Sequence, residues 1–264
     1  MLRTDQDIEG TETINVGAAT RRAHKLGLFD ALARVYAELP ETECPRCARC
    51  CFESPGMFLV EHLRLAEMMV ATPRPRRQAL WSAAWRELLF SWIEPERTCI
   101  FLDNARDCTI YNYRPLTCRI FGLFSPADPE QAQMELRLAA EQEAKQLRLF
   151  GLNIPEATLG RAIASCCQVK TTQGLRPKVD PDAIAERIAD IDAELIPREV
   201  VMREYCFLSL PDRLGRAAFG DEAVETLRIQ VLRRALRGEP LASLVDMVQQ
   251  QTRRPAACAG KDRK

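Results

Sequence analysis

Histidine and net charge are both scarce in this sequence. Only two histidines, His24 and His62, occur among 264 residues, so mixed Cys/His zinc fingers and multi-histidine catalytic centres lack ligands. Lysine plus arginine and aspartate plus glutamate both number 37, which gives a formal net charge of zero. Because such a chain has no overall field to hold nucleic acid or an anionic membrane, neither is an expected partner.

Long apolar runs and the familiar nucleotide and hydrolase motifs are also absent. The most apolar stretches, residues 57–60 and 88–93, are far shorter than the roughly 20 residues that a membrane helix needs. The first residues lack the basic start and apolar run of a secretory signal, so we expect a cytoplasmic protein. No GxxxxGK(S/T), GxGxxG, GxSxG or HExxH pattern occurs, which leaves phosphate cradles, dinucleotide folds and zincin chemistry without support.

Cysteine, in contrast, is abundant and clustered. Eleven cysteines are present, and seven of them fall between Cys44 and Cys118. Because the cytosol keeps thiols reduced, thiols spaced this closely are usually metal ligands or redox groups. Packing explains a single buried cysteine such as Cys206, and Cys258 lies in a basic tail. Packing does not explain seven clustered cysteines, so the pattern favours metal binding.

The first cysteine block has the spacing CxxCxxCC and consists of Cys44, Cys47, Cys50 and Cys51. Two thiolates separated by two residues reach one ion when the backbone turns tightly between them. The first three also match the opening of bacterial iron–sulfur runs, whereas Cys51 does not. Adjacent side chains diverge by about 100° on a helix and lie on opposite faces of a strand. We therefore expect Cys50 and Cys51 to reach different metals, or different parts of a multinuclear cluster.

The second block adds Cys99, Cys108 and Cys118. An eighth thiol is available from Cys166 or Cys167, a pair at the end of a predicted helix. Eight thiolates suffice for two four-cysteine sites, or for one cluster with spare thiols. Thiolate-rich sites suit both Zn²⁺ and iron–sulfur clusters of the 4Fe–4S type, and the spacing leaves this choice open.

Charged and aromatic residues near the thiols are candidates for contact with the bound group. Arg114 and Arg119 flank Cys118, and guanidinium groups offset the negative charge of all-thiolate centres. Arg46 and Arg49 are weaker candidates for the same role. Tyr111 is a further candidate, either as a hydrogen-bond donor to a ligand or, more commonly, as a packing residue.

An apolar shell and a turn are also predicted beside the thiols. Phe52, Phe58, Phe101 and Phe121 would limit solvent access to a metal, although any small core needs such residues. Asp103 precedes an asparagine after a short extended piece, so we expect a turn residue and not a ligand.

The combined motifs resemble the YkgJ-type cysteine-cluster family, which is described as a zinc- or iron-chelating domain. They are CxxCxxCC, CxFLD, CxIY and RPxxCR, and the matching residues are Cys44, Cys47, Cys50, Cys51, Cys99, Phe101, Leu102, Asp103, Cys108, Ile110, Tyr111, Arg114, Pro115, Cys118 and Arg119. The resemblance covers about residues 41–125 and implies metal chelation. A related cluster occurs in flagellin lysine-N-methylases, which use S-adenosylmethionine. A metal- or cluster-dependent group-transfer enzyme is therefore the alternative function.

Outside the cysteine blocks, apolar spacing predicts a mainly α-helical fold. The expected helices span residues 20–39, 61–70, 76–93, 129–150, 155–167, 181–195, 197–207, 211–219, 221–237 and 240–251. We expect a flexible arm over 1–18, a cysteine-cluster metal-binding domain over 19–168, a helical region over 169–251 and a disordered tail over 252–264. The fold class is mainly α, with an irregular cysteine-rich metal-binding region packed among helices.

The predicted function is coordination of an iron–sulfur cluster or zinc, in metal handling, redox sensing or electron transfer. No catalytic residue is identified, and whether the chain is an enzyme stays open. Besides the metal ion or cluster, a protein partner is compatible with each of these roles.

Overall fold

The computed structural model describes residues 15–44, 46–48, 50–94, 98–121, 123, 129–154, 170–171, 180–197 and 208–241. Within these ranges the chain is mainly α-helical, as predicted, and the cysteine-rich region lies among the helices. The helices expected at 155–167 and 197–207, most of that at 240–251, and the arm before residue 15 and the tail lie outside the described residues, as do Cys166 and Cys167. No helix in the described part of the chain is long and apolar enough to span a bilayer.

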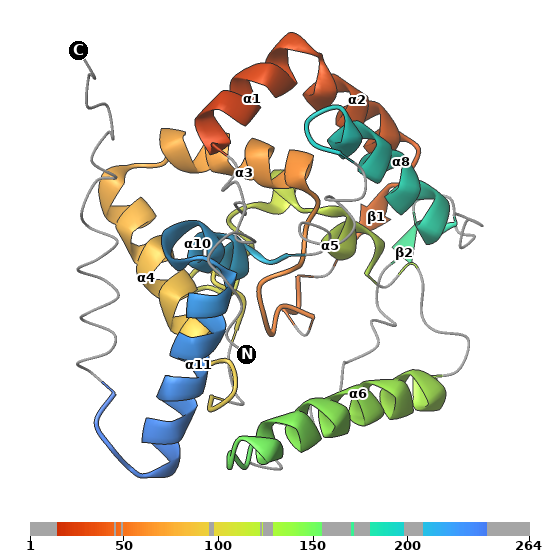
Figure 1. The fold of residues 1–264 in the computed structure, drawn as a ribbon. Helices are drawn as coiled ribbons and strands as arrows, with labels where there is room; N and C mark the ends of the chain where they lie inside the picture. Colours follow the sequence, from red (N-terminus) through yellow and green to blue (C-terminus); the bar gives the residue numbers. More distant parts are fainter. Residues whose placement is uncertain are drawn as a thin grey trace, which may run out of the picture.

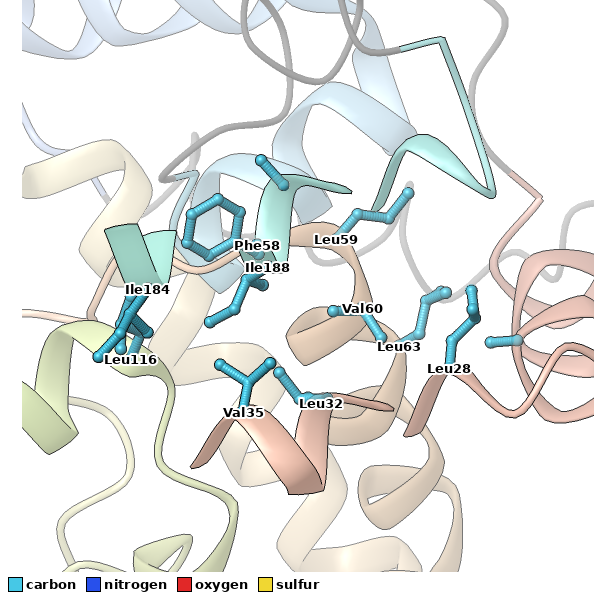
Figure 2. Packing of buried hydrophobic residues seen from close by; sticks show 12 residues of the cluster. Leu28, Leu32, Val35, Phe58, Leu59, Val60, Leu63, Leu116, Ile184 and Ile188 are labelled. Atoms are coloured by element: carbon cyan, nitrogen blue, oxygen red, sulfur yellow. The ribbon is translucent and has the colours of Figure 1, made fainter. Parts of the chain in front are cut away.

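One group of helices forms the upper part of the molecule in Figure 1. It comprises α1 (Val16–Lys25), α2 (Leu28–Ala37), α3 (Leu59–Ala71) and α8 (Pro181–Ala193). Their apolar faces meet in one core, in which Leu32, Leu63 and Ile188 are fully buried (Figure 2). Each such side chain contributes about 1.5–3 kcal/mol through its removal from water. This core fixes α3, the helix that directly follows the first cysteine block.

A second group comprises α4 (Arg74–Phe90), α10 (Leu210–Phe219) and α11 (Asp221–Leu236), which pack against one another. Gly215 allows α10 to approach α4, because a Cβ atom there would lie 2.6 Å from a methyl group of Leu88. Trp85 is buried in this core and meets the ring of Phe219 edge-on, with 5.5 Å between ring centroids. The C-terminal helices therefore pack directly on helices from the first half of the chain.

The remaining elements lie around these two groups. Helix α6 (Pro129–Leu149) stands apart from the other helices in Figure 1, and residues at its end pack against α11. Strand β1 (Thr42–Glu43) pairs antiparallel with β2 (Lys170–Thr171). The division predicted at residues 168/169 is crossed by this pairing and by the contact between α2 and α8.

The first predicted helix is in fact two helices. Gly27 adopts a left-handed conformation with φ of 67° between α1 and α2, a conformation that costs glycine little. Helix α1 also begins earlier than expected, at Val16, because the side chain of Asn15 accepts a hydrogen bond from the N–H of Ala18 at 3.0 Å. The pattern of apolar residues continued through Gly27, so it did not reveal the break.

Two buried carboxylates hold the N-terminus of α3. Asp192 of α8 accepts hydrogen bonds from the N–H groups of Leu59 and Val60, both at 2.7 Å. Glu61 accepts from the N–H of Phe58 at 2.8 Å. These bonds satisfy N–H groups that a helix cannot pair internally, and the negative charge suits the helix dipole. Helix α3 therefore begins at Leu59, two residues before the predicted start.

Replacing Asp192 with alanine should destabilise the protein by about 3 kcal/mol, because two buried N–H groups lose their acceptors. The measurement is the free energy of unfolding in urea. Glu186→Ala, at an exposed position on the same helix, is the matched control and should change stability by less than about 0.5 kcal/mol. Equal effects of the two substitutions would show that the α3 cap contributes nothing specific.

His62 is a buried histidine in the first turn of α3. It is 7% exposed, and its Nδ1 atom has no hydrogen-bond partner in the described structure. Burial, with the nearby charge of Arg213 as a smaller cause, lowers the pKa of His62 to about 3. Between this value and the ordinary pKa of about 6.5, only the unfolded chain binds the proton. The contribution of neutral His62 to the stability of the fold is therefore complete above pH 6.5. This contribution is lost as the pH falls toward 3.

We expect His62→Gln to reduce the slope of unfolding free energy against pH between pH 6.5 and 4, by up to about 1.4 kcal/mol per pH unit. Urea unfolding at several pH values measures this slope. His24→Gln is the control, because it removes the other histidine from an exposed position on α1. The same loss of slope in both variants would contradict the role of His62.

Candidate metal centre

All seven clustered cysteines line one cavity of about 220 Å³. They are Cys44, Cys47, Cys50, Cys51, Cys99, Cys108 and Cys118, and each is a free thiol. Cys47 is exposed and Cys99 is buried, whereas the other five are partly buried. The fold therefore brings the two cysteine blocks to one place that is open to solvent at one side. Cys166 and Cys167 lie outside the described residues, so their predicted contribution stays a prediction.

The backbone around the cavity is strained. Arg46, Ala48 and Arg106 have φ of 53°, 56° and 65°, and all three line the cavity. They are the only non-glycine residues with positive φ in the described part of the chain. A left-handed conformation costs such a residue roughly 1–2 kcal/mol. Strain of this kind is typical of ligand-binding sites, where the surrounding structure maintains it.

The thiols of Cys50 and Cys51 lie on the same side of the chain, with 4.0 Å between their sulfur atoms. The expectation that they diverge is wrong, because neither residue is in a helix or a strand. The N–H of Cys51 instead closes a turn onto the carbonyl of Ala48 at 3.2 Å. Two thiolates on one tetrahedral zinc ion are about 3.8 Å apart, given Zn–S bonds of about 2.3 Å. This pair can therefore bind one ion together.

The second block is a tight hairpin-like loop. Leu102 and Cys108 form an isolated antiparallel bridge. Between them the carboxylate of Asp103 accepts hydrogen bonds from the N–H groups of Ala105 and Asp107, both at 2.9 Å. Asp103 is thus the turn residue that the sequence predicted. The N–H of Cys99 donates to the carbonyl of Cys51 at 2.9 Å, which joins this loop to the first block.

The backbone also contacts two of the sulfur atoms. Hydrogen bonds from the N–H groups of Phe101 and Ile110 favour the thiolate forms of Cys99 and Cys108, respectively. Burial has the larger effect and raises the pKa of both thiols. Burial also raises the pKa of Cys118 to about 12, with the charges of Cys108 and Cys50 adding to the effect. Burial therefore favours the protonated thiols in this cavity, and several of them would become thiolates together only with a bound cation.

Four arginines supply positive charge at the wall of the cavity, where Glu53 is the only acidic side chain among the described lining residues. The guanidinium groups of Arg114 and Arg46 lie over the ring of Tyr111, at 3.7 and 4.6 Å from its centroid. Tyr111, in the short helix η1 (Tyr111–Tyr113), thus holds two cations at the site by cation–π contact. Arg106 lines the cavity as well, although no sequence signal pointed to it.

Arg119 has a second role in fixing the loop that precedes Cys118. Its guanidinium donates to the carbonyls of Arg114 at 2.7 Å and Asn112 at 3.1 Å. It also lies over the ring of Tyr36, 4.1 Å from the centroid. Burial lowers the pKa of Arg119. The two arginines predicted beside the metal thus both line the cavity. The contact of Arg119 with Tyr36 also connects the cavity to α2.

Glu61 positions the helix that carries Cys118. Besides capping α3, its carboxylate accepts hydrogen bonds from the hydroxyl of Tyr36 and, at 2.7 Å, from the N–H of Leu116. Leu116 is the first residue of α5 (Leu116–Ile120). Glu61 was not among the residues predicted for the site. Its place as the third residue of α3, where acidic residues often cap a helix, was the available signal.

Aromatic residues line the cavity only in part as predicted. Phe52, Phe101 and Phe121 are on its wall. Phe58 is not, because it points into the core between α2, α3 and α8 (Figure 2).

The donor set fits a thiophilic metal, since thiolates suit zinc and iron–sulfur centres. Among the described residues, however, no three histidine, cysteine, aspartate or glutamate side chains already converge on a single ion. The thiols surround a space and do not enclose one point.

Residues 43–143 match the CxxCxxCC family, described as "Putative zinc- or iron-chelating domain". The match confirms the resemblance that the cysteine motifs indicated, and it supports metal chelation by this segment. No curated protein and no solved structure matches the chain significantly.

We expect Glu61→Gln to weaken metal binding by roughly tenfold, a magnitude typical of residues that orient metal ligands. The amide cannot accept all three hydrogen bonds, so α5 and Cys118 lose their support. Competition with a chromophoric zinc chelator measures the affinity. Glu67→Gln, at an exposed position further along α3, is the matched control. Identical affinities of the two variants would exclude a positioning role for Glu61.

Proposed function

We propose that this chain is a metal-binding protein in which the seven cysteine thiolates hold zinc or an iron–sulfur cluster of the 4Fe–4S type. The observation that carries the proposal is that seven free thiols, from two blocks far apart in the sequence, line one cavity. A thiophilic metal would stabilise the thiolates that burial disfavours. Arg46, Arg106, Arg114 and Arg119 would offset the remaining negative charge.

The open cavity supports a role in metal handling. A structural zinc site uses four ligands and is closed, whereas this cavity has seven thiols, of which only Cys99 is buried. Exposed Cys47 is accessible to a thiol or metal ion from a partner protein.

Redox sensing or electron transfer would require the iron–sulfur occupant. Free thiols are also compatible with the reducing cytoplasm that the sequence analysis predicts.

The methylase-like alternative has no support in the described residues. Sites for ligands of the size of S-adenosylmethionine usually have volumes of about 300–1,000 Å³. The cavity is smaller, about 220 Å³, and cysteines occupy much of its wall. We therefore propose no group-transfer reaction.

Anaerobic purification followed by metal analysis, sulfide analysis and absorption spectroscopy tests the proposal. We expect the wild-type protein to retain zinc without labile sulfide, or iron with sulfide and visible absorption. Cys99→Ser should lose most of this metal, because it removes the most buried thiol of the cavity.

Cys258→Ser is the matched control, since Cys258 lies far along the sequence from both cysteine blocks. It should retain as much metal as the wild type. A wild-type protein that binds neither zinc nor iron under reducing conditions would overturn the proposal.

A further inference from the structure

We propose that the cavity binds two divalent metal ions, with the thiolate of Cys50 as a bridging ligand between them. This inference rests on the proposed function and specifies how the seven thiols divide. One ion would take Cys44, Cys47 and Cys51 of the first block, and the other would take Cys99, Cys108 and Cys118 of the second.

The number of donors is the first argument. Two four-coordinate ions have eight coordination positions, and seven thiolates fill all eight when one of them binds both ions. A single ion would leave three thiols of the cavity unused. The volume of about 220 Å³ also exceeds what one ion requires.

The extent of the family match favours a bridge over an eighth thiol. The matched segment, residues 43–143, contains all seven cavity cysteines and ends before Cys166 and Cys167. A centre that belongs to this domain should be completed by the residues of the domain. A bridging thiolate provides the eighth bond without any residue from beyond it.

The position of Cys50 selects it as the bridge. Its sulfur lies 4.0 Å from that of Cys51, close to the separation of about 3.8 Å expected on one tetrahedral ion. Cys50 also lies near enough to Cys118 for their charges to interact. It is thus in contact with its own block, and its charge acts on a thiol of the second. Cys108 also interacts with both blocks, through the charge of Cys44, but within the described residues its sulfur makes no thiol contact like that between Cys50 and Cys51.

The charge of the cavity wall agrees with two ions. Two divalent cations and seven thiolates together carry about three negative charges. The wall contains four arginines and one glutamate, and Arg46 also pairs with Asp107 at 3.9 Å. The wall therefore carries a net positive charge that offsets the negative charge of a two-ion centre.

The experiment is cadmium-113 NMR of the full chain reconstituted with ¹¹³Cd²⁺ under reducing conditions. We expect two signals with the chemical shifts of thiolate-bound cadmium, split by a coupling between the two nuclei through the shared sulfur. Cys50→Ser should abolish this coupling. The double variant Cys166→Ser/Cys167→Ser should retain both signals and the coupling. Zinc analysis of the wild type should give two ions per chain without labile sulfide.

Several outcomes would overturn the inference. These are a single cadmium signal, two uncoupled signals in the wild type, a coupling that survives in Cys50→Ser, or the loss of one ion from the Cys166/Cys167 variant. Iron with stoichiometric labile sulfide would overturn the two-ion centre and leave the proposed function intact. A protein that binds none of these metals would overturn both. The coupling in the wild type needs no substitution, so a variant that fails to fold does not block the test.

Discussion

The buried carboxylates at the start of α3 are the constraint on which the rest of the structure depends. Asp192 joins α8 to this point, and Glu61 joins it to α2 and α5. Burial raises the pKa of both acids, to about 7 for Asp192. The hydrogen bonds that each accepts from backbone N–H groups oppose this shift and offset the cost of burial. Without the two acids, the start of α3 and the helix that carries Cys118 would lose the carboxylates that join them to α8 and α2.

The same point explains how an irregular metal site is held by a helical fold. The cysteine blocks contain no regular element longer than α5 in the described residues, so their own hydrogen bonds fix little of their conformation. The first block is attached to the second by the bond from Cys99 to Cys51, and α5 is attached to Gly56 by the hydroxyl of Thr117 at 2.9 Å. Helices supply the rigidity, and the loops supply the ligands. Because the helices hold the loops in place, strained residues such as Ala48 can persist beside a binding site.

Much of this organisation was predictable from the sequence. Periodic apolar residues predicted α4, α6, α8, α10 and α11 to within a few residues, because packing follows directly from amphipathic spacing. Cysteine clustering predicted which side chains share one region.

The local geometry of the thiols was predicted wrongly. The divergence of Cys50 and Cys51 assumed a helix or a strand, but the residues form a turn. The contributions of Glu61 and Asp192 depend on elements more than 50 residues apart in sequence, and no local pattern reports such contacts.

The contrast between Cys99 and Cys47 bears on whether the centre holds the fold together or exchanges its metal. A metal that stabilises a fold is enclosed, because enclosure excludes competing ligands. Here two hydrophobic cores contain no residue of the cavity wall, whereas a third includes Cys99, Phe101 and Ile110 of the wall together with residues of α3 and α4. The described helices thus have apolar contacts that do not depend on the metal. Loss of metal should therefore leave the helices folded, a property that suits a protein that takes up and releases metal.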